Sequence, residues 1–370
     1  MSVRQIPFMS LAPGEDAPDV RRAIDRVIAR GWFVLGPEVE AFEAEFAAAA
    51  GAAHAVGVGN GTDAIALTLR ALGIGPGDEV ITAPLSAAYT ALAIMMTGAR
   101  PVFADIDPVR LTIDPERIVA AITSRTRAIV PVHLYGQAAD MGAIERIAAR
   151  HHLAVVEDCC QAHMAMANGR PVGTIGAAGA FSFYPTKTLG ALGDGGAIVT
   201  NDGSLAERIR RSRNGGQTDR YHHEVAGVNS RLDELQAAVL RARLPRLDAW
   251  TDRRRALAAR YRAQLAGARL HVPPELDPGH VYHLFVVRTD DRAALQAHLA
   301  GHGIETLIHY PVPIPRQPAL AASDPAACPA ANAACDEVLS LPLSHALGER
   351  DVDEVAAAVN AFERTDECVH

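Results

Sequence analysis

Residues 181–196 have the sequence FSFYPTKTLGALGDGG, which sets one lysine, Lys187, between an aromatic run and a glycine-rich run. The aromatic side chains offer an apolar wall, and the glycines let the backbone turn sharply and approach a ligand closely. A lysine exposed to solvent needs no such setting, whereas a lysine that must reach a bound ligand does. We therefore interpret Lys187 as a candidate covalent catalyst.

Patterns typical of strands and helices alternate on both sides of this stretch. Strands are expected over 54–58, 78–83, 101–105, 128–133, 153–157, 179–184 and 197–201. Helices are expected over 16–30, 38–50, 63–72, 87–96, 115–122, 141–150 and 204–213. This alternation predicts an α/β fold whose mostly parallel sheet is sandwiched between helices. Ligands bind at the carboxyl ends of the strands in such folds.

A long helical pattern over 231–266 is interrupted at Pro245, which cannot continue a regular helix. We place a domain boundary there, with a large domain over residues 1–245 and a small C-terminal domain over 246–370. The small domain is expected to be α+β. Its predicted parts are strands over 281–288 and 305–309, helices over 292–300 and 349–362, and a proline-rich loop over 311–318.

The composition excludes several classes of function. The chain has 370 residues, 49% of them hydrophobic, and a net charge of −8, which gives no global signal for nucleic-acid binding. It has neither a signal-peptide core nor an apolar run of transmembrane length. Its five cysteines form no CxxC pair, so no metal site is expected. The same cysteine pattern fits a reducing cytoplasm, which is the expected location.

Polar residues follow several of the expected strands. Asn60-Gly61-Thr62 opens a helix, where free N–H groups and the helix dipole favour a phosphate, although many such turns bind nothing. Asp158 ends a buried strand and is either a cap for a following helix or a functional carboxylate, with Gln161 three residues further on. Ser182, taken alone, is most simply a small polar residue on a strand.

Lys187, Asp158 and the residues around Gly61 indicate a function more clearly together than each does alone. A lysine that can form an imine and a carboxylate that can keep a pyridine nitrogen protonated are two parts of a pyridoxal phosphate site. A cradle of glycine, threonine and serine donors for a phosphate is the third part. Lys187, Asp158 and the residues around Gly61 match these three parts.

Several further segments make the chain recognisable. It resembles the fold-type I pyridoxal phosphate enzymes, and among them the DegT/StrS family of nucleotide-sugar aminotransferases. The matching segments lie in family order over roughly residues 5–362 and are 59–64, 75–80, 131–136, 156–163, 182–190, 195–196, 229–238 and 309–311. The resemblance implies a large domain with a seven-stranded type of sheet and a small α+β domain.

The resemblance also implies roles for matching positions. Lys187 would hold the cofactor as an imine, Asp158 would pair with its pyridine nitrogen, and Gln161 would contact its phenolic oxygen. Gly61, Thr62 and Ser182 would bind its phosphate. Asn229 would reach the phosphate in a neighbouring subunit, so a homodimer with shared active sites is implied.

The implied reaction moves an amino group, usually from L-glutamate, onto a keto-deoxysugar linked to dTDP, UDP or GDP, at C3 or C4. Some relatives carry His at the place of Lys187 and perform dehydration, so Lys187 favours transamination. Candidate substrate contacts are His163, Tyr184, Arg220, Tyr221, His309, Tyr310 and Arg316. The last three also fit an ordinary proline-rich loop.

Two departures from the family pattern stand near the expected cofactor ring. Cys159 and Cys160 follow Asp158, where small residues are usual. Ala88 stands where an aromatic residue often covers the ring, so either the adjacent Tyr89 takes that role or the ring face is more open. Two other functions stay open: a pyridoxal phosphate aminotransferase of ketocyclitols or other free ketones, and a non-catalytic regulator that keeps the fold.

Overall fold

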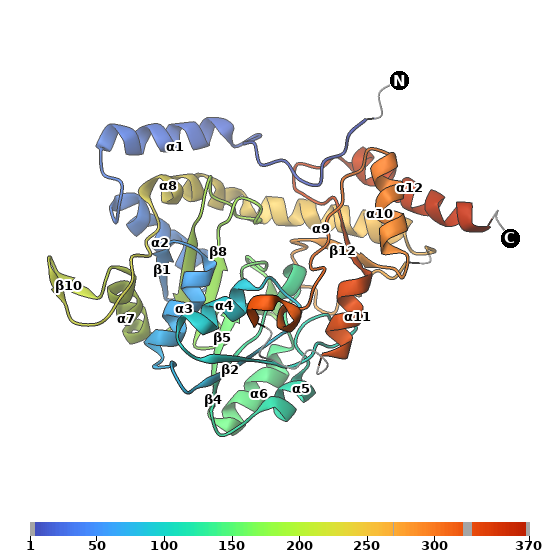
Figure 1. The fold of residues 1–370 in the computed structure, drawn as a ribbon. Coiled ribbons are helices and arrows are strands. Elements are labelled where there is room, and N and C mark those ends of the chain that lie inside the picture. The colour runs from blue at the N-terminus through green and yellow to red at the C-terminus, as the bar shows by residue number, and fades with distance from the viewer. Residues whose placement is uncertain (1–3, 269, 321–327, 368–370) are drawn as a thin grey trace.

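A seven-stranded sheet forms the centre of the computed structural model, which describes residues 4–268, 270–320 and 328–367 (Figure 1). The strand order is β1-β9-β8-β5-β4-β2-β3. The strands are β1 (His54–Val58), β2 (Glu79–Thr82), β3 (Arg100–Phe103), β4 (Thr126–Val130), β5 (Ala154–Asp158), β8 (Ala178–Ser182) and β9 (Gly196–Thr200). Only β9 runs against its neighbours, so the prediction of a mostly parallel sheet is confirmed.

Helices cover both faces of this sheet because alternate residues of each strand point to opposite sides. The helices are α1 (Ala17–Arg30), α2 (Pro37–Ala50), α3 (Gly61–Ala71), α4 (Tyr89–Met96), α5 (Pro115–Ala121), α6 (Met141–His151) and α7 (Gly203–Arg213). On β2, for example, Ile81 belongs to the core shared with α2, α5 and α6. Its neighbour Val80 belongs to the core shared with α3, α4 and α7.

The long helical pattern is broken where the sequence predicts. Helix α8 (Glu234–Arg243) passes through a 3-10 turn, η2 (Leu244–Arg246), into α9 (Leu247–Gln264). The first turn of α8 also anchors the N-terminal region. The buried Glu234 carboxylate accepts the backbone N–H groups of Gly36 (2.9 Å), Glu38 (2.9 Å) and Val39 (2.8 Å), which are the unpaired donors at the start of α2.

The C-terminal part has a second core around Tyr261 and Phe285. Its elements are β12 (Phe285–Arg288), α10 (Arg292–Gly301), α11 (Pro329–Glu337), β13 (Val338–Leu341) and α12 (Glu349–Glu367). The buried Asp105 carboxylate accepts the N–H groups of Ala330 (2.9 Å) and Ala331 (3.0 Å), which ties the start of α11 to the large domain. The larger core extends past η2 to residues such as Val281 and Val338, so the boundary at residue 245 remains a proposal.

One predicted strand is wrong. Residues 305–309 form a single bridge, Leu307 to Ser340, because the antiparallel partner of β12 is β13. The strand expected from residue 281 begins only at Phe285, since the N–H of Val281 is taken by Gly136 O (3.0 Å).

Short elements complete the fold. They are β6 (Met166–Ala167), β7 (Arg170–Pro171), β10 (Gln217–Asp219), β11 (His222–His223), η1 (Leu134–Gly136), η3 (Ile314–Arg316) and η4 (Pro318–Leu320). The β10–β11 hairpin projects from the body of the molecule beside α7 (Figure 1). Within the part of the chain that the structure describes, no helix combines the length and apolar character needed to cross a membrane.

Candidate active site

The lysine loop follows β8 and folds back on itself. The N–H of Ala191 donates to Phe183 O (2.7 Å), and the buried Arg243 donates from Nη1 to Gly190 O (2.6 Å). A Cβ atom on Gly190 would lie 2.6 Å from Pro185 O, so only glycine fits this turn. The aromatic wall is also present, because Phe183 packs edge-on against a phenylalanine of α2, Phe42.

Lys187 is partly buried at the carboxyl edge of the sheet. Burial lowers the pKa of its ammonium group, and the nearby side chains of Cys160 and Asp158 oppose that shift. A lysine with a lowered pKa is more readily deprotonated, and the neutral amine is the nucleophilic form. The environment therefore suits covalent chemistry at Nζ.

Asp158 is 5% exposed and has both carboxylate oxygens engaged. Oδ1 accepts the N–H of Cys160 (3.1 Å), and Oδ2 accepts the hydroxyl of Thr90 (2.6 Å). The residues that follow Asp158 form turns, not a helix, so its interpretation as a helix cap is wrong. Thr90 was not predicted from the sequence, because nothing in the pattern of α4 distinguishes it from the helix's other small residues.

Gln161 lies in a hydrogen-bond network that joins both domains. Its Oε1 accepts the N–H of Tyr135 (2.9 Å), which leaves Nε2 to donate to the hydroxyl of Tyr310 (2.8 Å). The hydroxyl of Tyr135 donates to the carbonyl of His309. These bonds assign the amide nitrogen of Gln161 as a donor, the character that a phenolate oxygen requires.

The start of α3 forms the expected cradle for an anion. Asn60 caps the helix by accepting the N–H of Asp63 (2.8 Å), so Gly61 and Thr62 supply the first amides of the helix. A Cβ atom on Gly61 would lie 2.7 Å from Cys160 Sγ and 2.9 Å from Ser182 Cβ. Gly61, Cys160 and Ser182 therefore meet, beside a helix N-terminus that favours negative charge.

His163 does not fit its expected role in substrate contact. Its ring has no exposed surface and packs against Phe181 and Phe183. Among the described residues neither ring nitrogen has a hydrogen bond of normal geometry, although the Ser182 backbone lies nearby. Burial, helped by the charge of Lys187, lowers the pKa of His163 to about 3. The side chain belongs to the core beneath the site.

Two histidines of the small domain approach the lysine instead. Burial, followed by the charge of Lys187, lowers the pKa of His309 to about 4 and that of His283 well below its usual value. His309 forms a hydrogen bond with Ser340 (2.9 Å) and lies beside Phe8. His283 was not predicted, because it lies at the edge of a strand-like run with no motif around it.

The remaining candidates lie at the surface. Tyr184, Arg220, Tyr221, Asn229 and Arg316 are all exposed, Tyr221 to 75%. Arg220 and Tyr221 stack on each other in the projecting hairpin, and Asn229 pairs with Asn214 at its base. This chain alone does not bring the hairpin residues to Lys187.

The residues expected to cover a cofactor ring begin α4. Ala88 is partly buried against Ala91 and Ile314, whereas Tyr89 is 65% exposed and lies near Tyr310. Tyr89 is thus free to turn towards a ligand, and its stacking role stays a prediction.

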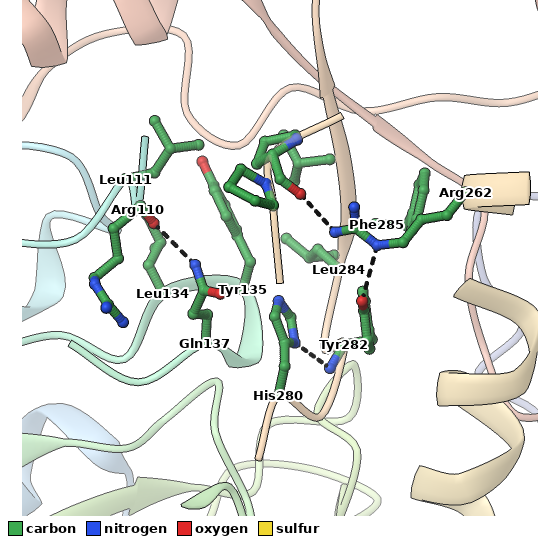
Figure 2. Close-up of a pocket in the computed structure, with 13 residues that line it drawn as sticks. Arg110, Leu111, Leu134, Tyr135, Gln137, Arg262, His280, Tyr282, Leu284 and Phe285 are labelled. Atoms are coloured by element: carbon green, nitrogen blue, oxygen red, sulfur yellow. Dashed lines mark hydrogen bonds between the residues drawn. The ribbon is translucent and has the colours of Figure 1, made fainter. Parts of the chain in front are cut away.

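Two hollows lie at the junction of the domains. The pocket in Figure 2 lies between Tyr135 and Gln137 on one side and His280 and Leu284 on the other, and its volume of about 30 Å³ suits a water molecule at most. A larger cavity of about 220 Å³ adjoins the lysine loop. It is lined by Phe8, Met9, Leu11, Thr186, His283, Leu284, Glu305, Leu307 and His309.

His133, Glu157 and Cys159 form a buried cluster behind the sheet edge. The N–H of Ala139 donates to Nδ1 of His133 (3.1 Å), so Nε2 carries the proton and donates to Glu157 Oε2 (3.1 Å). Glu157 also accepts three backbone N–H groups, those of Gly173, Ile175 and Gly176. This set of bonds holds the turn over 173–176 and explains the cluster without a ligand.

Comparisons with known proteins agree with this site. A transaminase from Streptomyces venezuelae named for dTDP-3-amino-3,4,6-trideoxy-alpha-D-glucose is 49% identical over 98% of both chains. A "pleiotropic regulatory protein" from Geobacillus stearothermophilus is 47% identical over 97% of this chain and 99% of its own. The crystal structure of S. venezuelae DesV in complex with a ketimine intermediate is 49% identical, with a TM-score of 0.94 over 97% of this chain and 98% of that chain.

The family comparison covers nearly the whole chain. Residues 15–360 match the model of the DegT/DnrJ/EryC1/StrS aminotransferases, a span that includes Lys187, Asp158, Gln161 and Asn229. The TM-score of 0.94 shows that the fold of this chain is shared with the S. venezuelae structure. The chain belongs to the DegT/DnrJ/EryC1/StrS aminotransferase family.

Proposed function

We propose that this protein is a pyridoxal phosphate-dependent aminotransferase that moves an amino group from L-glutamate onto a keto-deoxysugar linked to a nucleoside diphosphate. The observation that carries the proposal is the convergence of Lys187 and Asp158 with the start of α3 at one sheet edge. The transaminase name of a relative that is 49% identical supports the sugar-nucleotide substrate.

The residues present fit the cofactor. The first amides of α3 and the hydroxyl of Ser182 are donors suited to its phosphate. The buried carboxylate of Asp158, which has no ion pair among the described residues, suits a protonated ring nitrogen, and Gln161 suits the phenolic oxygen. When bound, pyridoxal phosphate supplies an electron sink for the carbanion formed at the amino acid's α-carbon.

Lys187 would do two things in this site. Its amine, whose neutral form burial favours, would hold the cofactor covalently at Nζ. When it is not attached to the cofactor, the same amine would act as a base toward the α-carbon of the amino donor and as an acid toward the sugar carbon. The neutral His309 and the Tyr310 hydroxyl would orient the sugar nucleotide beside it.

A homodimer with shared sites is part of the proposal. The apolar run Trp32, Phe33 and Val34 is exposed next to α2, and Asn229 and the hairpin face outward. Exposed apolar side chains of this size are typical of subunit interfaces. A second copy covering them would allow Asn229, Arg220 and Tyr221 to serve the neighbouring site.

We propose C3 as the aminated carbon, because the similar S. venezuelae transaminase is named for a 3-amino sugar. The cavity of about 220 Å³ beside Thr186 and His309 lies where a substrate next to Lys187 would extend. The reaction would belong to deoxyaminosugar biosynthesis, and the free cysteines suit the cytoplasm.

The test uses purified protein with pyridoxal phosphate. We expect an absorption band of the lysine-linked cofactor, its loss in Lys187→Ala, and repeated turnover of glutamate to 2-oxoglutarate only with a 3-keto-sugar nucleotide. Without the sugar nucleotide, at most one 2-oxoglutarate should form per bound cofactor. Protein that stays colourless with excess pyridoxal phosphate would overturn the proposal. Turnover of a free ketocyclitol instead would favour the free-ketone enzyme.

A regulator is the alternative of a different class, and the name of the Geobacillus relative keeps it in view. The intact set of Lys187, Asp158 and Gln161 argues against it, because a ligand-binding regulator needs no proton-transfer lysine. Cofactor attachment without a half-reaction with any common amino donor would favour the regulator.

A further inference from the structure

We propose that Thr90 is a positioning residue for Asp158: its hydroxyl holds the carboxylate in the orientation that meets the ring nitrogen of the cofactor. This inference rests on the proposed function. Thr90 lies on α4, 68 positions before Asp158, and the two side chains meet with Thr90 Oγ1 2.6 Å from Asp158 Oδ2. Thr90 is 2% exposed, so its hydroxyl cannot use bulk water as a partner.

Two other threonines, one within α3 and one at the end of α4, behave differently. Thr68 donates its hydroxyl to Ala64 O (2.7 Å) and Thr97 donates to Ile94 O (2.7 Å), the usual return to the previous turn. Thr90 instead donates across the space between α4 and β5. Its branched Cβ restricts the side chain to few rotamers, which limits the directions that the hydroxyl can take.

The bond completes the immobilisation of Asp158. The main chain of Asp158 is held on β5, where its N–H donates to Pro131 O (2.9 Å) and its carbonyl accepts the N–H of His133 (3.0 Å). The amide of Cys160 fixes Oδ1, and Thr90 fixes Oδ2. With both oxygens held, the plane of the carboxylate is set before any ligand arrives.

The bond also satisfies a polar group that lies in a buried place. A buried carboxylate is costly unless donors or a cation compensate it. The Thr90 hydroxyl and the Cys160 amide are the donors that compensate Asp158. Thr90 thus keeps Asp158 both oriented and ready to pair with a protonated ring nitrogen.

The helix that carries Thr90 is braced by the small domain. Ile314 donates its N–H to Pro84 O (2.9 Å), just before α4, and Ala91 packs against Ile314 and Leu320. The proline-rich loop that contains Arg316 therefore supports the helix on which Thr90 lies. Thr90 therefore contacts Asp158 in the large domain, and its helix is supported by the loop of the small domain.

The test compares Thr90→Val, Thr90→Ser and the control Thr97→Val in the full-length protein. Valine keeps the shape and removes the hydroxyl, and serine restores the donor. We expect Thr90→Val to raise the dissociation constant of pyridoxal phosphate roughly tenfold to hundredfold and to lower kcat with little change in KM for glutamate. Thr90→Ser is expected to recover most of both, and Thr97→Val to alter neither.

Thermal unfolding of the cofactor-free proteins separates orientation from folding, since Thr90→Val and Thr97→Val each remove one buried hydroxyl. Equal cofactor affinity in Thr90→Val and the wild type would overturn the inference, as would a folded Thr90→Ser that behaves like Thr90→Val. If the wild-type protein attaches no pyridoxal phosphate, the proposed function fails. If only the Thr90→Val effect is absent, the failure concerns Thr90 alone.

Discussion

The cofactor side and the substrate side of the candidate site are built in different ways. On the cofactor side, Asp158 and Gln161 have each of their polar atoms hydrogen-bonded within one chain, at the ends of buried strands. On the substrate side, Arg220 and Tyr221 project into solvent on a hairpin, and Arg316 lies exposed on a loop.

This difference suggests that one chain can hold the cofactor, whereas the substrate side would need a second chain. The cofactor side can orient a cofactor within one chain, because close packing at the buried sheet edge keeps its side chains in fixed positions. The exposed side offers its polar groups to solvent, where the proposed second subunit or a substrate would contact them. We therefore expect the chemistry to be set by the sheet, and sugar specificity to be set by loops that are completed between subunits.

The largest expected effect breaks the cofactor side outright. Lys187→Ala removes the amine that attaches the cofactor and moves the proton, so kcat should fall at least about 1,000-fold. Steady-state release of 2-oxoglutarate measures it. Lys187→Arg is the matched control, since it keeps the positive charge but cannot attach the cofactor, and it should be equally inactive. Activity above about a tenth of the wild-type value in either variant would contradict the assignment.

The second test asks whether Asn229 serves the active site of its own subunit or that of a neighbouring subunit. Asn229→Ala and Lys187→Ala should each be nearly inactive alone. After unfolding and refolding as an equal mixture, half of the dimers should contain one chain of each kind and one intact site, which restores about a quarter of wild-type activity. Asn229 that serves its own subunit would give no restoration.

A third test probes the close packing at the start of α3. Gly61→Ala places a Cβ atom 2.7 Å from Cys160 Sγ and 2.9 Å from Ser182 Cβ, so the cradle must open. We expect the dissociation constant of pyridoxal phosphate to rise about tenfold or more. Adding Cys160→Ala removes the sulfur and should restore part of the affinity, as measured by titration of absorbance. An unchanged affinity in Gly61→Ala would place the phosphate elsewhere.

The smallest expected effect concerns stability in acid. The pKa of His163 is about 3 in the folded protein, where burial disfavours the charged ring, and near 6.5 when unfolded. Between these values the unfolded chain binds more protons, so stability falls as pH drops through this window. At pH 5 His163 should cost about 2 kcal/mol relative to pH 8.

His163→Phe should therefore lose less stability between pH 8 and pH 5 than the wild type, as measured by urea unfolding at both pH values. His309→Phe is a poor control, because His309 borders the site, whereas the exposed His302 can be changed to Gln with no expected effect. Equal acid sensitivity of the wild type and His163→Phe would contradict the buried neutral ring.

The sequence predicts the large domain well, for physical reasons. Alternating periods and glycine stops mark α1, α2 and β1 almost to the residue, since these elements satisfy local preferences. The small domain is harder, because the pairing of β12 with β13 joins segments about 50 residues apart. A strand was predicted over 305–309, which makes only the bridge from Leu307 to Ser340, whereas β13 was not predicted and is set by tertiary packing.

The site shows the same division. Lys187 and Asp158 could be found because their chemistry needs those residue types beside marked strand ends. Thr90 and His283 could not be found, because no sequence motif surrounds a hydroxyl on a helix or an imidazole beside a strand. His163 was misplaced for the converse reason, since a polar residue near a motif can also be a core residue.

The cap that Glu234 places on α2 has a consequence for how the chain is made. The N–H donors of Gly36, Glu38 and Val39 have their acceptor in a carboxylate that lies nearly 200 residues later in the chain. A ribosome releases the N-terminal helices long before it has synthesised α8. The second helix of the nascent chain thus stays unanchored until about two thirds of the protein has emerged, so a truncation before residue 234 should leave this helix open to proteases.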